Sequence, residues 1–86
     1  MSAPEIVIYT TPFCGYCSAA KSLLDKKEVA YEEIDVSMDA ELRSQVIEKT
    51  GQRTVPQIFI NDEHIGGYDD LNALDQAGGL DPKLGL

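Results

Sequence analysis

The sequence predicts an α/β fold in which a central mixed sheet of four strands is flanked by helices. Short runs rich in β-branched and aromatic residues, typical of buried strands, alternate with longer segments whose apolar residues recur at helical spacing. The order of these segments is β-α-β-α-β-β-α. A chain of 86 residues is long enough for one such unit, so residues 1–86 are expected to form a single domain.

The first half of the chain is expected to contain two strands and two helices. Residues 5–9 (EIVIY) and 31–36 (YEEIDV) have the composition of strands. Between them lies a predicted helix, residues 15–27, with an apolar face formed by Ala20, Leu23 and Leu24. A second helix is predicted over residues 40–50, with Gly51 placed to end it. Three apolar residues of this helix are expected to face inward: Leu42, Val46 and Ile47.

The second half is expected to contain a hairpin and a last helix. Residues 57–60 (QIFI) and 63–65 are predicted strands joined by an Asn-Asp turn. The helix is predicted over residues 69–77 and the tail, residues 80–86, is expected to be loosely attached. Because helices link the first three strands, we expect these strands to be parallel, whereas the last two form an antiparallel pair.

Charge and hydropathy exclude several classes of protein. The formal net charge is −8 at pH 7, and such an acidic surface disfavours binding to nucleic acids and to anionic membranes. The longest apolar runs are far shorter than the roughly 20 residues that a transmembrane helix needs. The first residues also lack the basic and apolar regions of a signal peptide, so a cytoplasmic location is expected.

Two cysteines separated by two residues carry the strongest chemical signal. Cys14 and Cys17 form a Cys-Gly-Tyr-Cys motif between a predicted strand and a predicted helix. A closed structural zinc site needs about four ligands, and His64 is the single histidine of the chain. Burial as small apolar residues is a further alternative, but Gly-Tyr between the cysteines, after Thr-Thr-Pro-Phe, is not typical of a core. A redox dithiol is therefore the favoured interpretation.

The placement of the motif predicts different roles for the two thiols. Unpaired N–H groups and the helix dipole at a helix start favour a thiolate, which is the species that attacks sulfur. Cys14 is therefore predicted to be the nucleophile. Cys17, three residues further and one turn into the helix, is predicted to be the less exposed resolving thiol that closes a Cys14–Cys17 disulfide.

Three separated segments together resemble the glutaredoxin family: IYTTPFCGYC, TGQRTVPQIFI and HIGGYDDL. The resemblance covers nearly the whole chain and implies a thioredoxin-like fold. It also implies a thiol–disulfide oxidoreductase that uses glutathione as co-substrate and acts on glutathionylated or disulfide-containing proteins. An NADPH-dependent reductase would regenerate the glutathione. A thioredoxin-type reductase is a further option, but the absence of tryptophan and the GGYDD segment argue for glutathione.

The resemblance also implies a set of glutathione-binding residues. A cis peptide bond is expected before Pro56, leaving the backbone of Val55 to pair with the ligand. The glycines of GGYDD allow a close approach and the last helix offers N–H groups to a carboxylate, while Asp69 or Asp70 pairs with an amino group. Arg43 is expected to meet the other carboxylate, with Arg53 a lower-ranked alternative. The complete set is Tyr16, Arg43, Thr54, Val55, Pro56, Gly67, Tyr68, Asp69 and Asp70.

Two residues depart from the common family pattern. Thr11 stands where many members carry a lysine, so the electrostatic support of the Cys14 thiolate is expected to be weaker. Gly15 replaces the more common proline, which makes the motif more adaptable. This glycine also leaves open an alternative function, a [2Fe–2S] cluster held between two subunits by Cys14 of each and two glutathione thiolates. Without a cluster the protein is expected to be a monomer.

Overall fold

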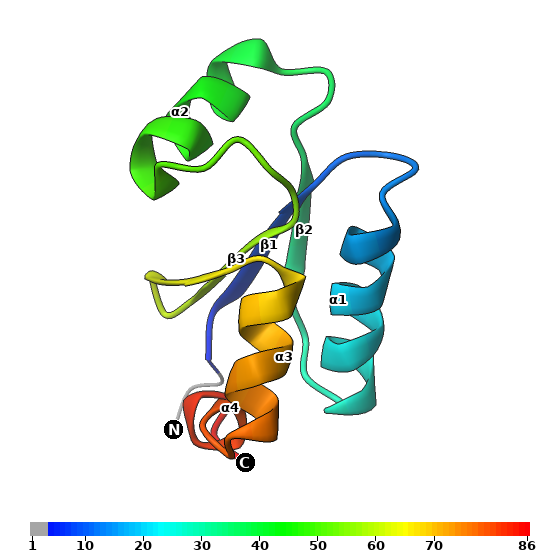
Figure 1. Cartoon of the computed structure of the whole chain (residues 1–86), viewed down its shortest axis with the longest axis vertical. Helices are drawn as coiled ribbons and strands as arrows, with labels where there is room; N and C mark the ends of the chain where they lie inside the picture. The colour runs from blue at the N-terminus through cyan, green and yellow to red at the C-terminus, as the bar shows by residue number, and fades with distance from the viewer. Residues whose placement is uncertain (1–3) are drawn as a thin grey trace.

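The computed structural model of the protein describes residues 4–86. Its four strands form one mixed sheet in the order β2-β1-β3-β4, and the helices lie around it (Figure 1). The predicted order of elements is confirmed, with one short helix added at the end. The elements are β1 (Ile6–Thr10), α1 (Gly15–Lys26), β2 (Glu32–Asp35), α2 (Ala40–Thr50), β3 (Gln57–Ile60), β4 (Glu63–Gly66), α3 (Tyr68–Gln76) and α4 (Leu80–Lys83).

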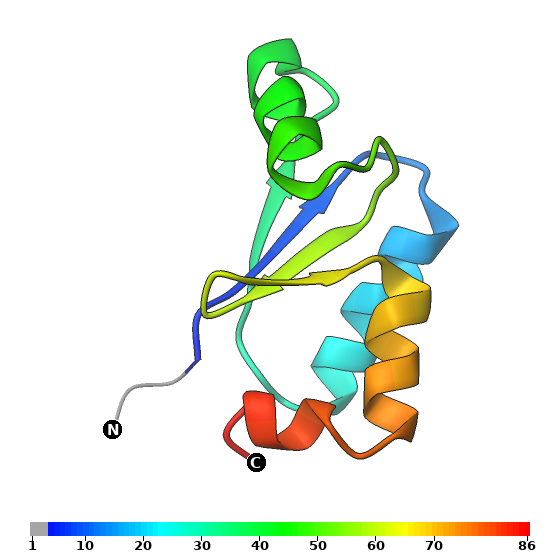
Figure 2. The ribbon, with the colours of Figure 1, turned by 60° about the vertical axis from the view of Figure 1, so that its left-hand side comes forward.

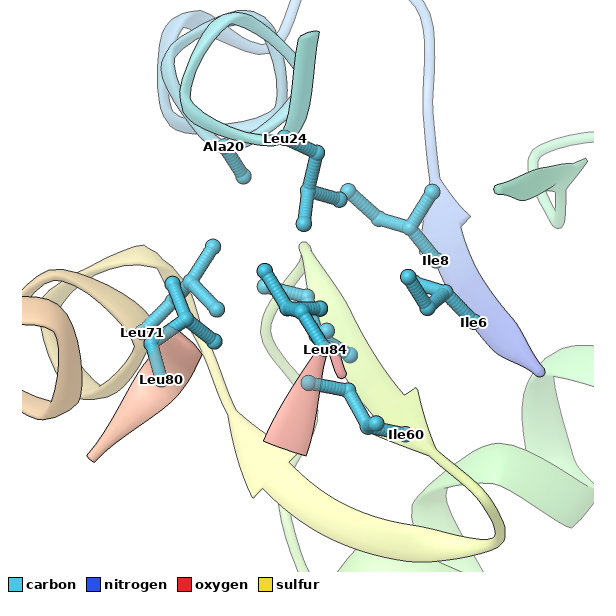
Figure 3. Close-up of a cluster of buried hydrophobic side chains, with 9 residues drawn as sticks. Ile6, Ile8, Ala20, Leu24, Ile60, Leu71, Leu80 and Leu84 are labelled. Carbon is cyan, nitrogen blue, oxygen red and sulfur yellow. The ribbon is translucent and has the colours of Figure 1, made fainter. Parts of the chain in front are cut away.

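The hydrophobic core lies between the sheet and the layer of α1, α3 and α4. Alternate residues of β1, beginning with Ile6 and Ile8, point into this layer because successive side chains of a strand face opposite sides. Ala20 and Leu24 of α1 meet them from the helical side, as Figure 3 shows. The same cluster contains Ile58, Ile60, Leu71, Leu80 and Leu84.

The direction of β3 differs from the prediction. β1 and β2 are parallel, as expected, but β3 runs antiparallel to β1, with Ile6 opposite Ile60 and Ile8 opposite Ile58. The expectation of three parallel strands was wrong because α2 does not carry the chain back along the sheet. Figures 1 and 2 place α2 at the end of the sheet where β2 ends and β3 begins. A connection that leaves and re-enters the sheet at the same end reverses the strand.

α2 is held at both ends by local capping. The side chain of Asp39 accepts a hydrogen bond from the backbone N–H of Leu42 at 2.9 Å. Gly51 ends the helix as predicted, with a φ of 71° that favours glycine. Of the three residues expected to face inward, Val46 is buried, whereas Leu42 and Ile47 are half-buried because α2 sits beyond the edge of the core.

The C-terminal tail is part of the core, so the prediction that it is loosely attached was wrong. Leu80 and Leu84 lie four residues apart on and just after α4, and both are buried against the sheet (Figure 3). Lys27 at the end of α1 forms ion pairs of 2.7 Å with Asp75 and 2.8 Å with Asp81. These contacts tie α4 to α1 and α3.

The helices are short. α1, with 12 residues, has little more than half of the roughly 20 residues needed to cross a bilayer. Within residues 4–86, no helix is long and apolar enough to span a membrane.

Candidate active site

Cys14 occupies the N-cap position of α1. The preceding residue, Phe13, adopts a left-handed φ of 58° and is fully exposed, so the chain turns sharply between β1 and α1. The backbone N–H of Cys17 donates to Cys14 Sγ at 3.2 Å. The cap therefore directs an N–H group at the sulfur predicted to act as nucleophile.

Cys17 is buried beneath Cys14, with 2% of its surface exposed. The pKa of the Cys17 thiol is raised to about 11, mainly by burial and secondly by its hydrogen bond with Cys14. Both cysteines are free thiols. At neutral pH Cys17 is a protonated thiol within reach of Cys14, which matches the predicted resolving role better than that of a first attacker.

A groove of about 280 Å³ lies on one side of Cys14. The segment before β3 forms part of its lining, and the Cys14 thiol donates to the Val55 carbonyl oxygen at 3.8 Å. The expected cis peptide bond is present between Val55 and Pro56. Eight of the predicted glutathione-binding residues line this groove: Tyr16, Thr54, Val55, Pro56, Gly67, Tyr68, Asp69 and Asp70.

Two tyrosines bring the helical elements of the groove together. The rings of Tyr16 on α1 and Tyr68 on α3 are stacked, with centroids 6.2 Å apart and an interplanar angle of 29°. α1 and α3 pack side by side over the sheet, which places the starts of both helices next to each other (Figure 1). The groove is thus built by residues that are about fifty positions apart in the chain, with aromatic side chains on one wall.

The start of α3 is shaped by glycine and aspartate. The Asp70 carboxylate accepts a hydrogen bond from the Gly67 N–H at 3.1 Å and so caps the helix. Gly66 has a φ of 120°, and a Cβ at this position would collide with the Asp70 carboxylate. Gly66 therefore allows the end of β4 to lie directly against the capping residue.

We expect Gly66→Ala to destabilise the fold by about 1–3 kcal/mol, since this backbone region is nearly restricted to glycine and the added Cβ displaces Asp70. Urea unfolding measures the change. Gly85→Ala is the matched control, because Gly85 also has a positive φ, 78°, but a Cβ there meets nothing within 4 Å. Equal losses in the two variants would show that the contact with Asp70 contributes nothing.

Arg43 does not line the groove. Its guanidinium donates instead to the backbone carbonyl of Arg53 at 3.4 Å. Its assignment to a carboxylate of the ligand stays a prediction, as does that of Arg53. Gln52 does line the groove and was missed by the sequence analysis. Its signal is slight, a single polar residue just before the Arg-Thr-Val-Pro segment.

A second hollow, of about 410 Å³, lies beside the two cysteines and contains charged side chains that the sequence analysis did not single out. Glu33 on β2 accepts from Lys21 Nζ at 3.0 Å and from the buried Thr10 hydroxyl at 2.9 Å. These hydrogen bonds lower the pKa of Glu33, with that from Lys21 the larger cause. The Lys21–Glu33 ion pair thus borders the active-site motif on the side opposite the groove that Tyr16 and Tyr68 line.

The four-stranded sheet and a dithiol at the start of a helix define the protein as a thiol–disulfide oxidoreductase of thioredoxin-like fold. The Glutaredoxin family model matches residues 6–65, more than half of the chain. The chain belongs to the glutaredoxin family.

Relatives and solved structures support this assignment over nearly the whole chain. The chain is 51% identical over 80 residues to Glutaredoxin 3 of Escherichia coli strain K12, covering 93% of this chain and 96% of that protein. The solution structure of glutaredoxin from Brucella melitensis matches with a TM-score of 0.88 and 48% identity, covering 98% and 91% of the two chains. A buckwheat glutaredoxin–glutathione complex matches with a TM-score of 0.89 and 34% identity, covering 95% and 77%.

Proposed function

We propose that residues 1–86 form a single glutaredoxin domain that uses glutathione to reduce protein–glutathione mixed disulfides and protein disulfides. The observation that carries the proposal is the contact between the Cys14 thiol and the Val55 carbonyl oxygen, at 3.8 Å. This contact joins the nucleophile to the groove in which eight of the expected glutathione-binding residues meet. A ligand seated in the groove would therefore have its sulfur near Cys14.

The groove offers suitable groups for each end of glutathione. The backbone of Val55 can pair with the peptide as an added strand. The N–H groups of Tyr68 and Asp69 belong to the first turn of α3, where helical donors lack partners within the helix, and can bind the γ-glutamyl carboxylate. Asp69 or Asp70 can pair with the α-amino group. Gln52 lines the groove, and its NH₂ group can donate to the glycine carboxylate, whereas Arg43 would have to leave the Arg53 carbonyl to do so.

The first step is attack by the Cys14 thiolate on the glutathione sulfur of a mixed disulfide. The bond between glutathione and the substrate protein breaks, the protein leaves as a thiol after taking up a proton, and Cys14 now carries glutathione. A second glutathione thiolate then attacks the glutathione sulfur and releases glutathione disulfide. An NADPH-dependent reductase would regenerate glutathione from this product.

Cys17 provides a second path. It gives up its proton and attacks Cys14 Sγ, forming the Cys14–Cys17 disulfide, and glutathione leaves and takes up a proton. The same disulfide forms when the substrate is a protein disulfide. Because burial keeps Cys17 protonated at neutral pH, this path is expected to be slower than release by free glutathione.

Turnover of a small glutathione mixed disulfide, coupled to NADPH oxidation through glutathione reductase, tests the proposal. Cys14→Ser is expected to lose all measurable activity, whereas Cys17→Ser keeps most of it because the glutathione path does not need a second thiol. A wild-type protein that is inactive in this assay would refute the proposed function. Loss of activity in Cys17→Ser alone would reverse the assigned roles.

Iron–sulfur cluster binding is the second candidate, favoured by the open space at Gly15. A Cβ at Gly15 would meet nothing within 4 Å, so the surface beside Cys14 is accessible to a bulky group. One chain does not suffice, because among residues 4–86 no three His, Cys, Asp or Glu side chains are grouped to hold a metal ion. Cys14 would have to be joined by a second copy and by glutathione thiolates.

Anaerobic purification in the presence of glutathione tests the second candidate. Visible absorption, iron content and size-exclusion chromatography would reveal a coloured dimer that is lost in Cys14→Ser. A colourless monomer without iron would contradict cluster binding and leave the oxidoreductase proposal intact.

A further inference from the structure

Gln57 is a polar residue buried in a strand whose other residues are apolar. It is the first residue of β3 (QIFI), and its exposed fraction is 0%. A buried amide costs free energy unless its hydrogen bonds are made, so its partners indicate why it is there.

One end of the Gln57 amide is bound to the segment that lines the groove. Its Nε2 donates to the Thr54 carbonyl oxygen at 2.9 Å and to Gln52 Oε1 at 2.9 Å. A carbonyl oxygen can only accept, so the NH₂ group must face Thr54. The chemistry of these partners therefore determines the orientation of the amide. Both partner residues, Gln52 and Thr54, line the groove.

The other end of the amide faces His64. The distance between Gln57 Oε1 and His64 Nε2 is 2.7 Å, and because the amide oxygen can only accept, Nε2 must carry the hydrogen. The His64 ring is itself fixed by β4. It lies against Phe59, its partner in the β3–β4 ladder, with ring centroids 5.1 Å apart.

These contacts form a continuous chain of hydrogen bonds from β4 to the groove. His64 holds Gln57, Gln57 holds Thr54, and the next residue, Val55, accepts from the Cys14 thiol. We propose that Gln57 and His64 are positioning residues, which set the backbone of the Thr54–Val55–Pro56 segment for glutathione. The inference rests on the proposed function. It adds a residue, His64, that lines neither the groove nor the hollow beside the two cysteines.

Substitutions at Gln57 and at His64 test the proposal. Gln57→Met keeps a similar volume without the amide, and His64→Phe keeps the ring against Phe59 without the N–H donor. His64→Phe removes one hydrogen bond and is expected to raise the KM for a small glutathione mixed disulfide about threefold to tenfold, the factor that corresponds to one such loss. Gln57→Met removes the bonds to Gln52, Thr54 and His64 together and is expected to raise the KM at least as much. The kcat should stay unchanged, because the reacting Cys14 thiolate has no hydrogen to donate to the Val55 carbonyl and keeps the hydrogen bond from the Cys17 N–H.

Two further variants complete the series. His64→Gln supplies an N–H donor again and is expected to bring the KM back toward the wild-type value. Glu63→Gln is the matched control, since Glu63 is the neighbour of His64 on β4 but pairs with Lys83 at 2.6 Å and not with Gln57. Its KM should equal that of the wild type.

The double variant separates positioning from simple stabilisation. If His64 acts through Gln57, adding His64→Phe to Gln57→Met causes no further rise in KM. Additive effects on KM would overturn the proposal, and so would single variants with a lower melting temperature but an unchanged KM below the unfolding transition. An inactive wild type would instead refute the proposed function itself, so the two failures are distinguishable.

Discussion

At pH 7 the alkylation of Cys17 by iodoacetamide is expected to be roughly ten-thousandfold slower than its limiting rate at high pH. The reagent attacks the thiolate, and a pKa of about 11 leaves roughly one Cys17 in ten thousand ionised at pH 7. Burial is the main cause, and the hydrogen bond with Cys14 adds to it. The rate should rise about tenfold for each pH unit between 7 and 10.

Fragmentation mass spectrometry of the alkylated protein measures Cys17 separately from Cys14. The same chain in denaturant is the control, because it removes burial and returns the pKa of Cys17 to the ordinary value of 9.0, making the thiol about a hundredfold more reactive at pH 7. Equal rates in the folded and the unfolded protein would contradict the assignment of Cys17 as a protected thiol. The expected result explains how two neighbouring cysteines avoid competing for the same substrate.

Leu80→Ala is expected to lower the free energy of unfolding by about 2–5 kcal/mol. Leu80 is fully buried in the cluster between the sheet and the helices, and truncation leaves a cavity that the neighbouring side chains can fill only in part. Equilibrium unfolding in urea measures the loss.

Leu86→Ala is the control for this prediction. Leu86 belongs to the same tail but has 63% of its surface exposed, so its truncation should change stability little. Similar small effects of both substitutions would contradict the inclusion of α4 in the core and return the tail to a peripheral role.

Local patterns predicted the elements near the active site well. The run EIVIY at residues 5–9 and the spacing of Ala20 and Leu24 correspond to β1 and α1, whose buried faces pack together. The direction of β3 could not be obtained in this way, because hydrophobic periodicity does not indicate at which end of the sheet a connection returns. Leu80 and Leu84 were overlooked because their four-residue spacing is interrupted by a proline and surrounded by glycines.

Predicting the candidate site required more than the spacing of residues along the chain. The Cys14–Cys17 motif and its place at a helix start followed from the residues, whereas the groove residues around Pro56 and Tyr68 came from the family resemblance. The pairing of Gln57 with His64 was missed because it requires the register of the β3–β4 hairpin, and Gln52 was missed because a single polar residue before the Arg-Thr-Val-Pro segment carries little signal. A glutamine within an apolar strand was the signal that could have drawn attention to Gln57.

The most direct test of the proposed function is to trap the glutathione adduct in Cys17→Ser and map it by NMR. After reaction with glutathione disulfide, we expect one glutathione on Cys14. The largest amide shift changes should fall on the groove, at Tyr16, Thr54, Val55, Gly67, Tyr68 and Asp69. A protein that forms no adduct would contradict the proposed function. So would amide shift changes confined to the opposite hollow around Lys21 and Glu33.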